Sequence, residues 1–78
     1  MTVYISPNPG KPMAYGISQR AAQILMAHGA KVLMQINLRE ECNTMGVQFL
    51  PQKECLEKTD VILTIGGDGT ILHEANLS

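Results

Sequence analysis

The stretch of sequence that decides the fold is VILTIGGDGT, at residues 61–70. Its first five residues form a near-continuous aliphatic run, which is typical of a strand buried on both faces of a parallel sheet. A loop rich in glycine follows at once, and the apolar Ile71, Leu72 and Ala75 predict that a helix begins after it. Open α/β sheets bind ligands beyond the carboxyl ends of their strands, so the sequence predicts an α/β fold with a ligand site at this loop.

The chemistry of the loop points to an oxygen-rich ligand. Glycines let the backbone approach closely, and the N–H groups at a helix N-terminus favour phosphate. Asp68 would repel a phosphate, so we interpret it as a group that deprotonates or hydrogen-bonds a hydroxyl, or that binds a divalent cation. Thr70 can cap the next helix or meet a phosphate. The alternative interpretation is a tight turn with Asp68 as a helix cap.

The loop fits neither of two common phosphate-binding motifs. The P-loop pattern is absent, and a Rossmann fingerprint that began at Gly67 and Gly69 would need a third glycine where Leu72 stands. The ligand class therefore does not follow from a standard fingerprint.

The remainder of the chain alternates predicted strands and helices. Strands are expected near residues 2–6, 31–36 and 61–65, with a short extended piece at 47–50. This alternation predicts a Rossmann-like, three-layer α/β unit with a parallel sheet. Asn8 and Lys11 lie in the proline-rich loop after the first strand. We interpret both as solvated, although the topology would direct Lys11 toward the carboxyl end of the sheet.

Three helical segments are expected between the strands. The first begins at Ser18 as its N-cap and ends at Gly29. Asn37 caps a second, which Gly46 ends, and Pro51 opens a third. The residues expected on their buried faces are Ile17, Ala21, Ile24, Leu25 and His28 in the first, Leu38, Cys42 and Met45 in the second, and Cys55 and Leu56 in the third.

Composition excludes several classes of protein. The 78 residues carry six Lys and Arg against seven Asp and Glu, and no basic stripe, so nucleic acid and acidic membrane surfaces are poor partners. The longest apolar run is too short to span a bilayer, and the first residues lack the pattern of a signal peptide. We therefore expect a cytoplasmic protein with reduced cysteines. Neither cysteine has a partner at metal-binding spacing, so no metal ligand is assigned.

Residues 65–75, IGGDGTILHEA, resemble the signature of NAD kinases, also called polyphosphate/ATP-NAD kinases. Diacylglycerol and sphingosine lipid kinases share the Gly-Gly-Asp-Gly-Thr core, and phosphofructokinases carry a close relative of it. Lipid kinases usually continue with one apolar residue and then Asn-Glu, whereas this chain has Ile71-Leu72-His73. The first strand, its Asn-Pro loop and the following helix also resemble the NAD kinase pattern, less specifically.

The resemblance implies transfer of a phosphoryl group from ATP or polyphosphate to the 2′-hydroxyl of the adenosine ribose of NAD. It implies Asp68 as general base, with Mg²⁺ or another divalent cation to compensate charge. It implies that Gly69 contacts the dinucleotide and that Gly66, Gly67 and Thr70 shape the loop and meet phosphate. His73 takes a cofactor-contacting position where the family often has arginine.

Family members are several times longer than these 78 residues. Their Asn-Glu or Asn-Asp pair and their C-terminal glycine-rich β domain are absent here. We therefore expect residues 1–78 to be a partial N-terminal nucleotide-binding domain of an NAD kinase. The intact enzyme is expected to form a homo-oligomer, and the 78-residue chain alone to be inactive and to bind dinucleotide weakly. The alternatives are a catalytic piece of a lipid kinase and a nucleotide-binding module without catalysis.

Overall fold

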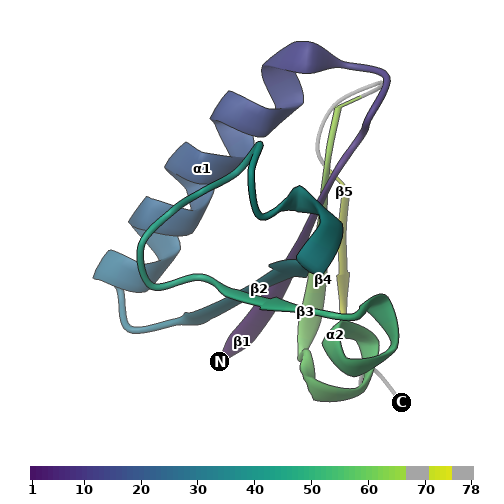
Figure 1. The fold of residues 1–78 in the computed structure, drawn as a ribbon. Helices are drawn as coiled ribbons and strands as arrows, with labels where there is room; N and C mark the ends of the chain where they lie inside the picture. The colour runs from purple at the N-terminus through teal and green to yellow at the C-terminus, as the bar shows by residue number, and fades with distance from the viewer. Residues whose placement is uncertain (67–70, 75–78) are drawn as a thin grey trace.

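A computed structural model describes residues 1–66 and the backbone of residues 71–74 (Figure 1). Its longest helix packs on a sheet whose strands come from both halves of the chain. The elements in chain order are β1 (Thr2–Pro7), α1 (Pro12–Ala27), β2 (Lys31–Gln35), the 3₁₀ turn η1 (Ile36–Leu38), β3 (Gln48–Leu50), α2 (Gln52–Lys58), β4 (Val61–Ile65) and β5 (Ile71–Glu74).

The sheet has the strand order β3-β2-β1-β4-β5. The first four strands in this order are parallel, and Val3 of β1 is paired with Val32 of β2 on one side and Val61 of β4 on the other. The three principal strands and the extended piece near 47–50 are therefore confirmed. So is the predicted parallel α/β fold.

Two helices cover opposite faces of the sheet and make three layers. Side chains alternate along β1, so that Val3 and Ile5 pack in the cluster beneath α1, whereas Tyr4 packs with Leu33 and Cys55 beneath α2. This alternation follows from the twofold period of a strand. Because apolar residues occupy both faces, the central strands read as continuous apolar runs. The predicted three-layer, Rossmann-like unit is confirmed.

Helix α1 differs from its prediction in its start. It begins at Pro12, with Lys11 as the N-cap residue, so Ser18 lies inside the helix and is not a cap. Proline suits the first helical position because it needs no hydrogen-bond partner for its nitrogen. The end agrees with the prediction, since Gly29 has a positive φ of +88°.

The buried face of α1 also differs from its prediction. The fully buried residues are Ala14, Ser18 and Ala22, while Ile17 and Ile24 are 49% and 54% exposed. Small side chains at i, i+4 and i+8 let the helix axis approach the sheet closely, which larger residues would prevent. Helical periodicity favours the face with the larger apolar side chains. It therefore cannot predict that a neighbouring face of small side chains packs on the sheet.

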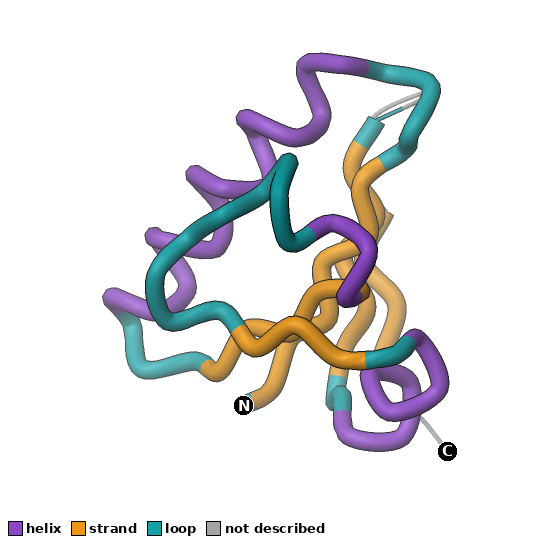
Figure 2. Tube along the Cα trace, in the orientation of Figure 1, coloured by secondary structure: helices purple, strands orange, loops and turns teal. Residues whose placement is uncertain are grey.

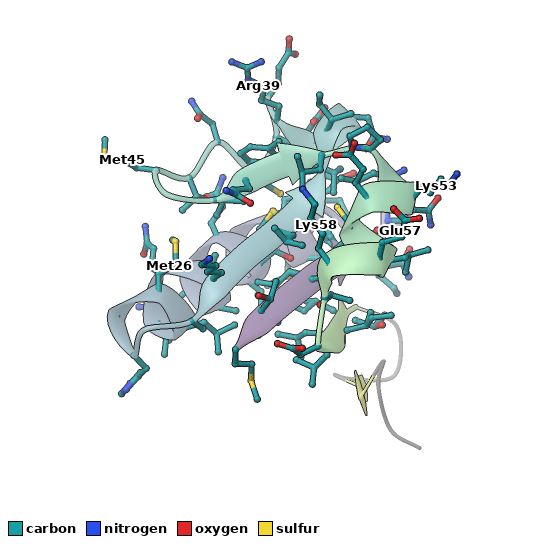
Figure 3. All side chains as sticks on the ribbon, turned by 90° about the horizontal axis from the view of Figure 1, so that it is seen from below. Met26, Arg39, Met45, Lys53, Glu57 and Lys58 are labelled. Atoms are coloured by element: carbon teal, nitrogen blue, oxygen red, sulfur yellow. The ribbon has the colours of Figure 1, made fainter. Side chains whose placement is uncertain are left out.

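The predicted helix over 37–46 is wrong. The link between β2 and β3 holds only the turn η1 and then loop, as the tube in Figure 2 shows. Cys42 is buried as expected, but Met45 is 94% exposed and projects from the molecule in Figure 3. A parallel crossover needs about a dozen residues or more, and this link has little beyond that length. The link therefore connects β2 to β3 through η1 and a loop and has no length left for an α-helix. Gly46 adopts a φ of +94° within it.

Of the two residues predicted on the buried face of α2, one is buried. Cys55 is buried, but Leu56 is 46% exposed, because one face of a helix this short reaches the sheet. Lys53, Glu57 and Lys58, which are labelled on this helix in Figure 3, are also exposed.

The helix predicted after residue 70 is also wrong. Residues 71–74 form β5, which pairs antiparallel with β4 from Thr64↔Ile71 to Val61↔Glu74. A short apolar run is compatible with either structure. The free edge of β4 offers unpaired N–H and C=O groups, and pairing with the returning chain satisfies them.

Candidate functional site

The strand order places a topological switch point between β1 and β4. The chain moves from β1 to β2 and β3 on one side of β1, and then crosses to β4 on the other side. At the carboxyl edge of the sheet, Pro7 of β1 is paired with Ile65 of β4, so Asn8 and Gly66 leave the sheet side by side. In open α/β sheets the crevice at this point is where ligands bind.

Gly66 is required at this edge by its conformation and by its neighbours. Its φ is +113°, which is strained for any residue with a side chain. A Cβ at this position would lie 2.6 Å from the Cβ of Asn8 and 3.6 Å from the Cβ of Ala14. The backbone at the start of the glycine loop therefore lies directly against the first loop and the first turn of α1.

The loop after β1 is a hydrogen-bonded turn that leads into α1. The Oδ1 atom of Asn8 accepts the N–H of Gly10 at 2.9 Å, and the carbonyl of Asn8 accepts the N–H of Lys11 at 3.0 Å. Lys11 is exposed, and its carbonyl accepts the N–H of Ala14 at 2.9 Å. The N-terminus of α1, with the positive end of its dipole, thus borders the same edge as Gly66.

The structure places two of the predicted site residues. Gly66 lies at the switch point. Residues 67–70, which include Gly67, Asp68, Gly69 and Thr70, fall outside the described residues. The backbone of His73 is paired with Ile62, which lies four residues before Gly66. Because β5 runs antiparallel to β4, His73 lies along the sheet, away from its carboxyl edge. The roles assigned to these residues remain predictions.

Sequence reasoning missed the contribution of Asn8. It was interpreted as a solvated loop residue, but it is half-buried and packed against Gly66. The signal that could have found it is the pairing of two loops, each at the carboxyl end of a predicted parallel strand. Only the strand order shows that these two strands are neighbours.

Among the described residues, the titratable groups with shifted pKa values lie in the core. Burial raises the pKa of the Cys42 and Cys55 thiols and of the Tyr4 phenol. The thiol of Cys55 donates to the carbonyls of Met34 and Leu50, at 3.4 and 3.5 Å. A raised pKa keeps these groups protonated, so none of the three is an activated nucleophile.

The described part of the chain does not form a closed ligand site by itself. Residues 1–66 and 71–74 enclose no pocket and hold no group of three His, Cys, Asp or Glu residues that could bind a metal ion. Neither of the two described helices has the length and apolar character needed to cross a membrane. What this part offers at the carboxyl edge is backbone, a fixed turn and a helix N-terminus.

The sheet topology, the three layers and the switch point define a Rossmann-like α/β domain. Residues 3–78 match the profile of the ATP-NAD kinase N-terminal domain. The chain is also 33% identical over 75 residues to the NAD kinase of Halorhodospira halophila, an alignment that covers 95% of this chain and 24% of that relative. The chain belongs to the NAD kinase family.

This finding confirms the resemblance inferred from residues 65–75, and it does not favour a lipid kinase or a non-catalytic module. The chain spans about a quarter of the length of the curated relative. No solved structure matches it.

Proposed function

We propose that this chain is the N-terminal part of an enzyme that phosphorylates the 2′-hydroxyl of the adenosine ribose of NAD, with ATP or polyphosphate as the donor. Membership of the NAD kinase family supports the activity. The structural observation that carries the proposal is Gly66. It sits at the switch point in a conformation and a space that exclude a side chain. A loop that begins this way can bring its backbone close to a ligand at the carboxyl edge.

In this proposal Asp68 is the general base that takes the proton of the 2′-hydroxyl as the phosphoryl group is transferred. Gly66, Gly67, Gly69 and Thr70 shape the loop and contact the dinucleotide or its phosphates, and His73 contacts the cofactor. Phosphoryl transfer asks little covalent chemistry of the protein. An oriented nucleophile and compensation of charge provide most of the catalysis.

A divalent cation would help to neutralise the phosphates when bound. The described residues bring no cluster of carboxylates to the carboxyl edge, so they do not by themselves fit such an ion. What this chain's own edge supplies is the N-terminus of α1, whose dipole favours an anionic group.

We also propose that residues 1–78 form only one wall of the site. A dinucleotide pocket normally buries most of its ligand between several elements. The chain covers 24% of the length of the NAD kinase that it matches, which supports a second wall supplied by a longer protein. The chain alone should then bind NAD weakly and show no kinase activity. A cytoplasmic location and a homo-oligomeric enzyme belong to the same proposal.

The test is Asp68→Asn in the complete reading frame that contains this chain. We expect NAD binding within a few fold of the wild type and kcat for NADP formation lowered roughly 10²- to 10⁴-fold, the usual contribution of general-base catalysis. Calorimetric titration with NAD would measure the binding, and steady-state kinetics with ATP and NAD would measure kcat.

Asp60→Asn is the matched control, since it makes the same chemical change at the amino end of β4. There the Asp60 carboxylate accepts the N–H of Thr2 at 2.9 Å, and an amide oxygen can replace it. Its kcat should match the wild type. Wild-type turnover in Asp68→Asn would rule out the role of Asp68 as base.

A further inference from the structure

We infer that Asn8 is a positioning residue for the glycine loop, one that holds the carboxyl end of β4 and fixes the conformation of Gly66, the first residue of that loop. The inference rests on the proposed function, because that function requires the loop to present Asp68 to a bound hydroxyl. Asn8 makes one backbone hydrogen bond to β4, two hydrogen bonds within its own turn and one close contact with Gly66, whereas its neighbours Pro9 and Gly10 are exposed.

The backbone of Asn8 extends the sheet beyond the last residue of β1. Its N–H donates to the carbonyl of Ile65 at 2.7 Å. Pro7 has no N–H to offer, so this bond at Asn8 ties the end of β1 to the residue that precedes Gly66. The end of β4 is thereby fixed immediately before the glycine loop starts.

The side chain of Asn8 is locked by its own turn. Its Oδ1 accepts the N–H of Gly10 at 2.9 Å. A backbone N–H can bond only to an acceptor, so this contact sets which way the amide group faces. The carbonyl of Asn8 also accepts the N–H of Lys11 at 3.0 Å, which closes the turn into α1. The side chain is therefore a rigid part of the loop, and half-buried.

This rigid side chain occupies the space beside Gly66. The Cβ of Asn8 lies 2.6 Å from the point where a Cβ of residue 66 would stand. The backbone nitrogen of Asn8 lies 3.6 Å from the same point. The Cβ of Asn8 therefore packs against Gly66, which adopts a φ of +113° at this point. If the turn of Asn8 relaxed, the first residue of the glycine loop would lose the surface that defines its path.

The sheet itself does not depend on the side chain of Asn8. Five residue pairs join β1 to β4, from Val3↔Val61 to Pro7↔Ile65. At the amino end, the Thr59 hydroxyl donates to the carbonyl of Thr2 at 3.1 Å, and the Asp60 carboxylate accepts the Thr2 N–H. Loss of the Asn8 side chain should therefore change the orientation of the loop and leave the fold intact.

The experiment compares Asn8→Ala, Asn8→Ser and wild type in the complete reading frame. Alanine keeps the Cβ but loses the acceptor for Gly10, whereas serine keeps both the Cβ and an acceptor oxygen. Because small misplacements of reacting groups are costly, we expect Asn8→Ala to lower kcat about 10- to 100-fold, with KM for NAD changed by only a few fold. Asn8→Ser should recover at least about fivefold of that loss. Asn43→Ala, at an exposed loop residue, is the control and should behave as wild type.

Three outcomes would overturn the inference while the wild type makes NADP. They are a kcat for Asn8→Ala within twofold of wild type, no recovery in Asn8→Ser, and loss of folded structure in Asn8→Ala, measured by thermal unfolding. A wild type that makes no NADP overturns the proposed function, and the inference falls with it. The wild-type assay therefore separates the two failures.

Discussion

Replacing Gly66 by alanine has two separable costs that the structure defines. The first is conformational, because a φ of +113° costs a residue with a side chain about 1–2 kcal/mol. The second is steric, because the new Cβ would lie 2.6 Å from the Cβ of Asn8. Asn8 cannot easily retreat while its N–H is bonded to Ile65. Overpacking of this kind costs about 1–3 kcal/mol, so we expect Gly66→Ala to lower the free energy of unfolding by about 2–5 kcal/mol.

Two other glycines of the chain separate these costs. Gly29 has φ +88° and nothing within 4 Å of an added Cβ, so Gly29→Ala should show the conformational cost alone, about 1–2 kcal/mol. Gly16 lies inside α1, again with nothing within 4 Å. Alanine is the better helix former, so Gly16→Ala should stabilise the protein by about 0.5–1 kcal/mol. The difference between Gly66→Ala and Gly29→Ala reports the contact with Asn8 together with the change in φ from +88° to +113°.

The assay is urea unfolding followed by circular dichroism, with an osmolyte added equally to all samples where a folded baseline is needed. With an m value of about 1 kcal/mol/M for a small domain, the midpoint of Gly66→Ala should lie about 1–3 M below that of Gly29→Ala. Equal midpoints for these two variants would refute the reasoning. They would mean that Asn8 does not confine residue 66, and the inference about Asn8 would lose its geometric basis.

Two further predictions concern the core. The Ser18 hydroxyl is buried and has no hydrogen-bond partner among the described residues, so Ser18→Ala should raise the free energy of unfolding by about 1 kcal/mol. A lower melting temperature for Ser18→Ala in thermal unfolding would show that the hydroxyl has a partner. Burial raises the pKa of the Cys42 and Cys55 thiols, so the folded protein keeps protons that the unfolded chain releases. Stability from this source should be complete below the ordinary thiol pKa of 9.0 and decline as pH rises above it, as urea midpoints at pH 7.5 and pH 10 would measure. The same decline in a variant with both cysteines replaced by alanine would assign it to other groups, such as Tyr4, whose pKa burial also raises.

The sequence alone determined the features that depend on local patterns. The strands over 2–6, 31–36 and 61–65 were predictable because runs of aliphatic residues buried on both sheet faces leave no helical or alternating period. Gly29 was identifiable as the end of α1 because a left-handed turn favours glycine. The family was recognisable from the loop and its flank at residues 65–75. Each of these signals lies within about a dozen consecutive residues.

The tertiary structure decided what depends on contacts between distant segments. The buried face of α1 runs through Ala14, Ser18 and Ala22, because the sheet admits small side chains there and leaves Ile17 exposed. Residues 71–74 form a strand because the edge of β4 was open to pair with them. Asn8 meets Gly66 because β1 and β4, separated by more than fifty residues in the chain, are neighbours in the sheet. No local pattern encodes strand order, so the wall of the candidate site became visible only when the two loops were placed at one edge.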